Sequence, residues 1–152
     1  MTHTITRRPR KKYRLVVDTG VLVSAFVFGG NPAKAVRKAF HEADICVSPE
    51  LLSEYRTVPM ELKSKGKINH TQFEVLIASI AAFVVAAVLV KPSRKLSICR
   101  DPKDDMLIEC CIAGKARLLI SGDKDLLELQ KLPFDLKIIT PRIYLETVID
   151  LS

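Results

Sequence analysis

The sequence predicts a three-layer α/β/α fold built around a central, mostly parallel sheet. Short apolar runs alternate along the chain with longer segments of helical periodicity, a pattern typical of a parallel sheet covered by helices on both faces. The chain has 152 residues, enough for one domain with a single core. Apolar residues make up 48% and charged residues 27%, which is an ordinary globular composition.

Short segments rich in Val, Ile and Leu are predicted as strands. The first ends at Val17, directly before Asp18, and a later one ends at Ser121, just before Asp123. The predicted strands are residues 15–17, 45–47, 84–90, 118–121 and 136–140. Because the carboxyl ends of parallel strands meet at one edge of the sheet, the acids that follow them are candidates for a ligand site.

Capping residues and prolines mark the helix starts. Ser48-Pro49 and Asp101-Pro102 each place a capping side chain before a proline at the first helical position. Residues 71–74 have the pattern of a capping box, and Gly114 is expected to end its helix. The predicted helices are residues 21–28, 31–43, 48–58, 71–83, 101–114 and 123–132, with a last helix after Pro141.

The apolar stretch at residues 73–90 is just long enough to span a bilayer, but the capping box and the later valines favour a buried helix followed by a strand. No membrane association is expected. The four cysteines show no Cys-x-x-Cys pairing and no histidine at ligand spacing, which argues against zinc. We expect them to be reduced core residues of a cytoplasmic protein, since the basic N-terminus lacks an apolar signal segment.

The formal charge of +7 is concentrated at the N-terminus. Of 24 basic residues, six lie within residues 1–14, which leaves 18 basic against 17 acidic residues in the rest of the chain. These six are Arg7, Arg8, Arg10, Lys11, Lys12 and Arg14. Such an arm either holds nucleic acid phosphates or is a passive leader. We therefore divide the chain into a basic arm, residues 1–13, and one domain, residues 14–152.

The stretch VVDTGVLVSA, residues 16–25, places Asp18 among apolar residues. Three enzyme classes use such an aspartate: Asp-Thr-Gly peptidases, Asp-x-Asp phosphotransferases and metal-dependent nucleases. The alternation of strands and helices argues against the first, because those peptidases are built from β-strands and need a dimer or a duplicated domain, and this chain has no second Asp-Thr-Gly. Gly20 stands where a phosphotransferase needs its second acid. The pattern therefore favours a metal-dependent nuclease.

Further acids are predicted near the same edge of the sheet. Glu54 lies on the apolar side of its helix. Asp101, Asp104 and Asp105 open another helix, in which Asp101 is expected to be the cap. Two converging carboxylates repel each other by roughly 4 kcal/mol at about 4 Å and an effective dielectric of 20. A divalent cation removes that penalty, and oxygen ligands suit Mg²⁺ or Mn²⁺.

Three blocks of sequence resemble the PIN domain family, in particular its VapC-like toxins of toxin-antitoxin pairs. They are VVDTGVLVSA, SPELLSEYRTV and DPKDDMLIECCIAGKARLLISGDKDLL, within residues 14–145. The resemblance assigns the family's catalytic, metal-binding acids to Asp18, Glu54, Asp105 and Asp123. Thr19, Ser121 and Asp125 are expected beside the site. The family usually has an asparagine where this chain has Gly20, which removes an amide from the site.

Helical periodicity alone does not choose between Asp104 and Asp105, since both lie in the first turn with apolar residues at helical spacing. The resemblance selects Asp105, because the family's third acid directly precedes an apolar triplet such as residues 106–108. Asp104 is then expected to be a favourable charge at the helix start and to matter only for stability.

The resemblance implies an endoribonuclease that uses Mg²⁺ or Mn²⁺ to hydrolyse single-stranded RNA, leaving 5′-phosphate and 3′-hydroxyl ends. It also implies a cognate antitoxin that occludes the acidic site, and a homodimer. Two other interpretations stay open from the sequence: a housekeeping RNA-processing nuclease without an antitoxin, and a degenerate PIN domain that only binds RNA or protein.

Overall fold

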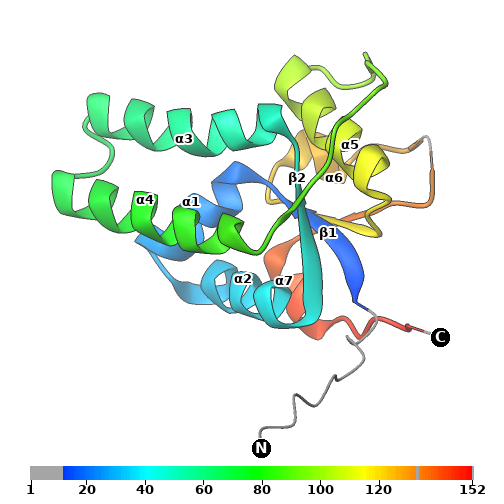
Figure 1. Ribbon diagram of the computed structural model, residues 1–152, viewed down its shortest axis with the longest axis horizontal. Helices are drawn as coiled ribbons and strands as arrows, with labels where there is room; N and C mark the ends of the chain where they lie inside the picture. Colours follow the sequence, from blue (N-terminus) through cyan, green and yellow to red (C-terminus); the bar gives the residue numbers. More distant parts are fainter. Residues whose placement is uncertain (1–11, 133, 152) are drawn as a thin grey trace, which may run out of the picture.

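The computed structural model describes residues 12–132 and 134–151, and it confirms the predicted α/β/α architecture (Figure 1). The described strands form one parallel sheet in the order β3-β2-β1-β4-β5. The strands are β1 (Tyr13–Val17), β2 (Ala43–Val47), β3 (Val88–Leu89), β4 (Leu118–Ile120) and β5 (Lys137–Ile139).

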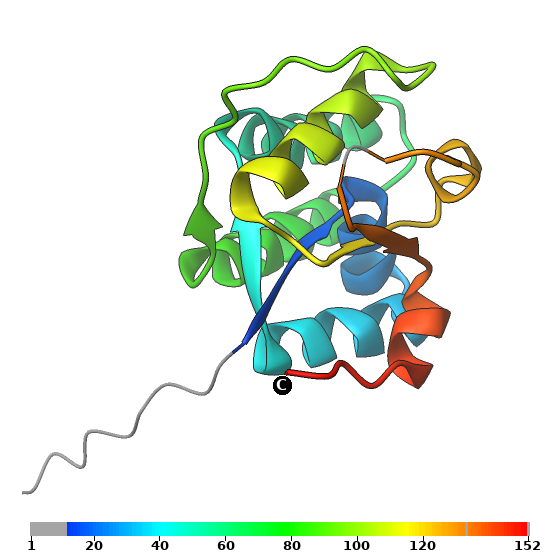
Figure 2. The same ribbon diagram turned by 90° about the vertical axis from the view of Figure 1, so that its right-hand side faces the viewer.

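Helices cover both faces of this sheet. The described helices are α1 (Thr19–Val27), α2 (Gly30–Glu42), α3 (Pro49–Ser64), α4 (His70–Val85), α5 (Pro102–Gly114), α6 (Lys124–Leu127) and α7 (Pro141–Glu146). Helix α5 packs against β1, β2 and β4, whereas α2 packs against β2 and α7. Figure 2 shows α5 on one side of the sheet and α2 with α7 on the other.

Strand β1 lies at the centre of the sheet, where the strand order changes direction. Strands β2 and β3 extend from one side of β1, and the chain then crosses back to add β4 and β5 on the other side. The β1–β4 pairing continues past the strands, because the N–H of Asp18 donates to the Ile120 carbonyl at 3.0 Å. In open α/β sheets, ligands bind outside the carboxyl ends of the strands at such a switch point.

The central strands β1 and β4 are apolar at every position except Arg14. Leu15, Val16 and Val17 are at most 1% exposed, and the residues of β4 are at most 3% exposed. Strands covered on both faces need continuous rather than alternating apolar residues, which is why the sequence shows short unbroken runs. Polar groups therefore enter at the strand ends, where Asp18 and Ser121 stand.

Several element boundaries differ from those predicted from the sequence. Helix α4 begins at His70, because Asn69 forms a capping box with Gln72 rather than Thr71 with Glu74. Only residues 88–89 pair as a strand after it, since α4 continues to residue 85. Helix α6 is a single turn that ends at residue 127, well before the expected end at residue 132.

Helix α5 ends at Gly114 as predicted, but Gly114 is its last helical residue and does not take the left-handed position after the helix. The left-handed position is taken by Lys115, at φ 52°. A Cβ at Gly114 would lie 2.7 Å from Cys46 Sγ, a distance that real side chains avoid. The glycine therefore reflects the close approach of α5 to β2.

The apolar stretch that begins at residue 73 forms most of α4, a helix of 16 residues. Within the described part of the chain, no helix is long and apolar enough to cross a membrane. The buried face of α4 consists of Leu76, Ile80 and Phe83. All four cysteines are free, and all but Cys99 are buried.

Candidate active site

A hollow of about 590 Å³ opens at the carboxyl ends of β1 and β4. The acids that line it include Asp18 after β1, Glu54 on α3, Asp104 on α5 and Asp123 after β4. We call this hollow the acidic pocket. Asp101, expected only as a helix cap, also lines it, as does Lys103, whose backbone N–H donates to the Asp101 carboxylate at 3.0 Å.

Asp18 is held at the end of β1 through both its backbone and its side chain. The hydroxyl of Ser121 donates to Asp18 Oδ2 at 2.7 Å, in addition to the bond from the Asp18 N–H to β4. Burial raises the pKa of Asp18 against the opposing effect of the Ser121 bond, and the charge of Asp123 raises it further. Asp18 is thus a fixed carboxylate in surroundings that disfavour its charge.

Ser121 connects two of the pocket acids. Its side chain is fully buried, and while its hydroxyl donates to Asp18 it also accepts the backbone N–H of Asp123 at 3.0 Å. Asp123 in turn caps α6, because its Oδ1 accepts the N–H of Asp125 at 2.9 Å. One hydroxyl therefore fixes the loop that carries Asp123 relative to Asp18.

Glu54 reaches the pocket from α3, and its neighbour Tyr55 fastens that helix to the sheet. The hydroxyl of Tyr55 donates to the carbonyl of Val17, the residue before Asp18, at 2.5 Å. Burial raises the pKa of Glu54, and the charge of Asp18 adds to the increase. Glu54 therefore lies at the edge of the sheet where its sequence position predicts it.

The adjacent acids Asp104 and Asp105 lie in the first turn of α5 and are both buried, at 8% and 5% exposure. The side chain of Asp104 lines the acidic pocket and accepts no hydrogen bond from any described residue. Asp105 Oδ1 instead accepts the backbone N–H groups of Ile98 and Cys99, at 3.0 and 2.9 Å. The structure thus places Asp104 in the lining of the pocket with Asp18, whereas Asp105, which the resemblance selects, contacts backbone N–H groups.

Burial raises the pKa of Asp104 to about 6, and the charges of Asp123, Asp101 and Asp18 add to that increase. Three of the pocket acids thus have raised pKa values, with burial as the largest cause and a neighbouring acid as a further one. Carboxylates that disfavour one another's charge in a pocket are typical of a functional site. A positively charged ligand would relieve this repulsion.

Carboxylate oxygens are the ligands that Mg²⁺ and Mn²⁺ prefer, so the chemistry of the four acids fits a divalent cation. Among residues 12–132 and 134–151, however, no three acidic, histidine or cysteine side chains are grouped tightly enough to form a finished cation site. The acids line the pocket without surrounding one point. Cation binding thus requires the side chains to move closer together.

Thr19 and Asp125, both expected beside the site, contact Asp18 and Asp123 through their backbone. Thr19 is 2% exposed, and its hydroxyl has no hydrogen-bond partner among the described residues. Asp125 is exposed and contributes only its backbone N–H, to Asp123. Gly20 lines the pocket, and a Cβ there would meet no heavy atom within 4 Å. Crowding therefore does not explain why the family's asparagine is missing.

The expected basic arm falls only partly within the described residues. Arg7, Arg8, Arg10 and Lys11 lie outside them. Lys12 is exposed, whereas Arg14 belongs to β1 and its Nη1 donates to the Gly114 carbonyl at 3.1 Å. Tyr13 is also buried in β1, so this strand begins one residue before the domain start expected from the sequence.

The segment between β3 and α5, residues 91–100, was not singled out from the sequence, and we call it the strap. Two buried acids of α5 hold it through its backbone. Glu109 Oε2 accepts the N–H of Leu96 at 2.8 Å, and Asp105 accepts the two N–H groups described above. The sequence signal for this segment is its charge, since it contains Lys91, Arg94, Lys95 and Arg100 but no acid.

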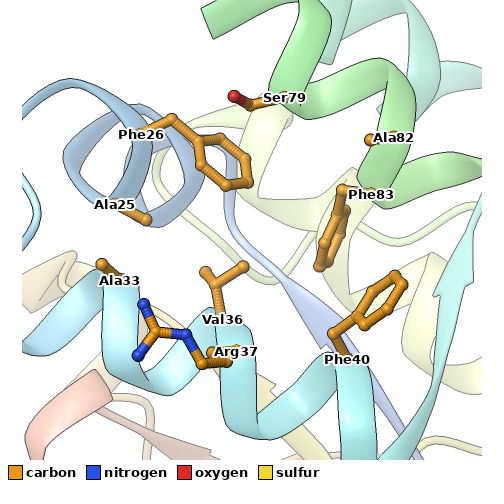
Figure 3. A pocket seen from close by; sticks show the side chains of 9 residues that line it. All are labelled: Ala25, Phe26, Ala33, Val36, Arg37, Phe40, Ser79, Ala82 and Phe83. Carbon is orange, nitrogen blue, oxygen red and sulfur yellow. The ribbon is translucent and has the colours of Figure 1, made fainter.

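An apolar hollow lies elsewhere on the molecule, between α1, α2 and α4. Figure 3 shows Phe26, Phe40 and Phe83 around it, with the guanidinium of Arg37 at one side. Its lining contains no acid, histidine or cysteine and so offers no side chain that suits a cation. The acidic pocket is therefore the better candidate for chemistry.

A family model described as PIN domain matches residues 14–125, a range that contains every acid that lines the pocket. The chain belongs to the PIN domain family. The match confirms the resemblance drawn from the three sequence blocks. Uncharacterized protein MJ1680 of Methanocaldococcus jannaschii is a similar protein, 29% identical over 121 residues that cover 78% of this chain and 76% of the relative.

A solved structure is also similar to this PIN domain. It is the crystal structure of VapBC2 from Rickettsia felis bound to a DNA fragment from their promoter. The match has a TM-score of 0.56 and 14% sequence identity, and it covers 84% of this chain and 98% of the matched chain. At this identity the likeness shows a shared fold.

Proposed function

We propose that this PIN domain is a metal-dependent endoribonuclease that hydrolyses single-stranded RNA. The observation that carries the proposal is the acidic pocket, in which four carboxylates from separate elements line one hollow at the switch point of the sheet. Membership in the PIN domain family supports nucleic acid as the substrate. The raised pKa values of Asp18, Glu54 and Asp104 support a cationic ligand.

Asp18, Glu54, Asp104 and Asp123 are the residues that would hold Mg²⁺ or Mn²⁺. When bound, such a cation acts as a Lewis acid toward the scissile phosphate and makes water a better nucleophile. Ser121 keeps the loop of Asp123 fixed relative to Asp18. At a pKa of about 6, Asp104 binds a proton in competition with the cation.

We further propose that the protein is the toxin of a toxin-antitoxin pair. The structural relative belongs to a VapBC2 assembly, and the fold is shared. A small antitoxin that covers the acidic pocket would keep RNA from the four acids, and a homodimer is the expected assembly of the nuclease. Addition of the protein encoded by the neighbouring gene should then abolish RNA cleavage. Unchanged cleavage would favour a housekeeping RNA-processing nuclease.

Cleavage of a panel of short single-stranded RNAs tests the nuclease proposal. We expect products with 5′-phosphate and 3′-hydroxyl ends when Mn²⁺ or Mg²⁺ is present, and none in excess EDTA. Asp18→Asn should lower the rate by more than the roughly 10- to 100-fold typical of losing a group that only supports a metal ligand. The matched control is Asp135→Asn, which changes an exposed acid outside the acidic pocket and should leave the rate unchanged.

Two outcomes would contradict this proposal in different ways. Undiminished cleavage in excess EDTA would exclude the metal-dependent mechanism. A folded protein that cleaves no RNA of the panel with either cation would instead favour a degenerate PIN domain that only binds RNA or protein.

A further inference from the structure

The strap is rich in cationic side chains. Lys91, Arg94, Lys95 and Arg100 are exposed, and the strap contains no acid. Within the described part of the chain, none of these four side chains forms an ion pair or a hydrogen bond. Their positive charge is therefore available to an anionic partner.

The strap has neither helix nor strand structure, yet hydrogen bonds hold it to α5 at two positions. Asp105 binds the backbone N–H groups of Ile98 and Cys99, and Glu109 binds that of Leu96. Both acids are buried, at 5% and 7% exposure, so their bonds to N–H groups compensate for the loss of hydration. Because these bonds use only the backbone of the strap, its basic side chains are left to solvent.

These hydrogen bonds place the strap along α5 and toward the acidic pocket. Asp105 and Glu109 are four residues apart, which corresponds to about 6 Å along the helix axis. Figure 2 shows the strap, in green, running beside α5 to the start of that helix. Its last residue, Arg100, directly precedes Asp101, which lines the acidic pocket.

A pocket lined by acids repels the phosphates of its own substrate. Asp18, Glu54, Asp101, Asp104 and Asp123 line it against a single cation, Lys103. Unit charges at about 4 Å interact by roughly 4 kcal/mol at an effective dielectric of 20, so a nucleic acid needs cations next to the pocket as well as within it. Electrostatic contacts with phosphates dominate the affinity of proteins for nucleic acids.

We propose that the strap is a phosphate-binding track that guides single-stranded RNA into the acidic pocket. This inference rests on the proposed function, since it takes the substrate of the pocket to be RNA. Asp105 and Glu109 act here as positioning residues, which hold the backbone of the strap while its cations contact the RNA. The track is an alternative to the N-terminal arm as the RNA-binding element.

Fluorescence anisotropy with a labelled single-stranded RNA tests the track directly, in EDTA and over a range of salt concentrations. Arg94→Glu combined with Lys95→Glu should weaken binding by about tenfold or more and lower the slope of log Kd against log salt by up to roughly 1.4, at about 0.7 per lost contact. The neutral pair Arg94→Gln and Lys95→Gln should have an intermediate effect. Thermal melting establishes that both double variants are folded.

The matched control is Lys65→Glu combined with Lys67→Glu, which makes the same change in net charge. Both lysines are exposed, and Lys65 lies at the far end of α3, roughly 16 Å along the helix axis from Glu54. RNA affinity within about threefold of wild type in this control, together with the loss in the strap variant, supports the track.

Three results would overturn the inference. They are equal losses of RNA affinity in the strap and control variants, an unchanged salt slope in the strap variant, or a strap variant that still binds RNA but no longer binds polyglutamate, titrated as a second ligand. The last result would assign the strap to an acidic protein partner. Because binding is measured in EDTA, failure of the nuclease proposal is seen separately. If the protein cleaves no RNA but the strap variant binds RNA more weakly, this inference is supported. If the protein is an active nuclease and the strap variant binds RNA as well as wild type, this inference is overturned while the nuclease proposal stands.

Discussion

Asp104 and Asp105 are consecutive residues of α5, but they serve two different regions of the molecule. Residues next to each other on an α-helix point about 100° apart, so one side chain meets the acidic pocket and the other meets the strap. Asp105 accepts two backbone N–H bonds, while Asp104 accepts none from the described residues. Asp105 thus holds the chain's own backbone, whereas Asp104 is left for a ligand.

Burial does not distinguish the two acids, because both are less than 9% exposed. They differ in what compensates for the burial. Hydrogen bonds to a charged group contribute roughly 1.5–3 kcal/mol each, and Asp105 has two of them. Asp104 has acidic neighbours instead, which help to raise its pKa to about 6. A buried acid without partners thus indicates function, whereas a buried acid with backbone partners indicates structure.

The largest expected effect on stability comes from the strap side of α5. Asp105→Ala leaves the N–H groups of Ile98 and Cys99 without their acceptor, so the free energy of unfolding should fall by about 1–3 kcal/mol. Asp105→Asn keeps an oxygen acceptor and should lose less. Urea unfolding followed by circular dichroism measures both variants. If Asp105→Ala is as stable as wild type, the strap is not held by this residue.

On the pocket side, replacing Asp104 should have a smaller effect on the free energy of unfolding, and of the opposite sign. The pKa of Asp104 is about 6 in the folded protein against an ordinary value of 3.8, so the folded state binds more protons between these values. Its contribution to stability therefore falls as the pH rises through that range and is unfavourable above it. In EDTA near pH 7, the free energy of unfolding of Asp104→Asn should exceed that of wild type by on the order of 1 kcal/mol.

Thermal melts in EDTA at about pH 5 and pH 7 check this prediction, since Asp104→Asn should lose less stability than wild type between the two conditions. Asp105→Asn is the control, and its difference in melting temperature between the two pH values should equal that of wild type. A less stable Asp104→Asn protein near pH 7 would show that the pocket acids do not repel one another.

Much of the fold could be predicted from the sequence because its signals are local. Ser48 and Asp101 cap their helices as expected, through bonds to the N–H groups of Leu51 and Lys103. The unbroken apolar runs of β1 and β4 reflect burial on both faces, which a single strand already displays in its sequence. The end of α5 at Gly114 could be predicted, but the reason for a glycine there could not, because it depends on contact with Cys46, which local sequence does not reveal.

The candidate site was predicted in part. Asp18 and Asp123 follow central strands, and Glu54 lies on the buried side of α3, so the position of each in the fold can be inferred from neighbouring residues. The third acid could not be chosen in this way, because Asp104 and Asp105 have the same helical periodicity. The two acids differ only in that Asp105 accepts hydrogen bonds from the strap. The strap is a coil, so its contact with Asp105 leaves no periodic pattern in the sequence.

The proposed metal site consists of Asp18, Glu54, Asp104 and Asp123, and parallel Mn²⁺ titrations of Asp104→Asn and Asp105→Asn test it most directly. By isothermal titration calorimetry, Asp104→Asn should weaken Mn²⁺ binding by about tenfold or more and abolish RNA cleavage. Asp105→Asn should bind Mn²⁺ within about threefold of wild type and still cleave RNA. If Asp105→Asn instead loses metal and activity while Asp104→Asn keeps both, the claim is contradicted and Asp105 belongs to the metal site in place of Asp104.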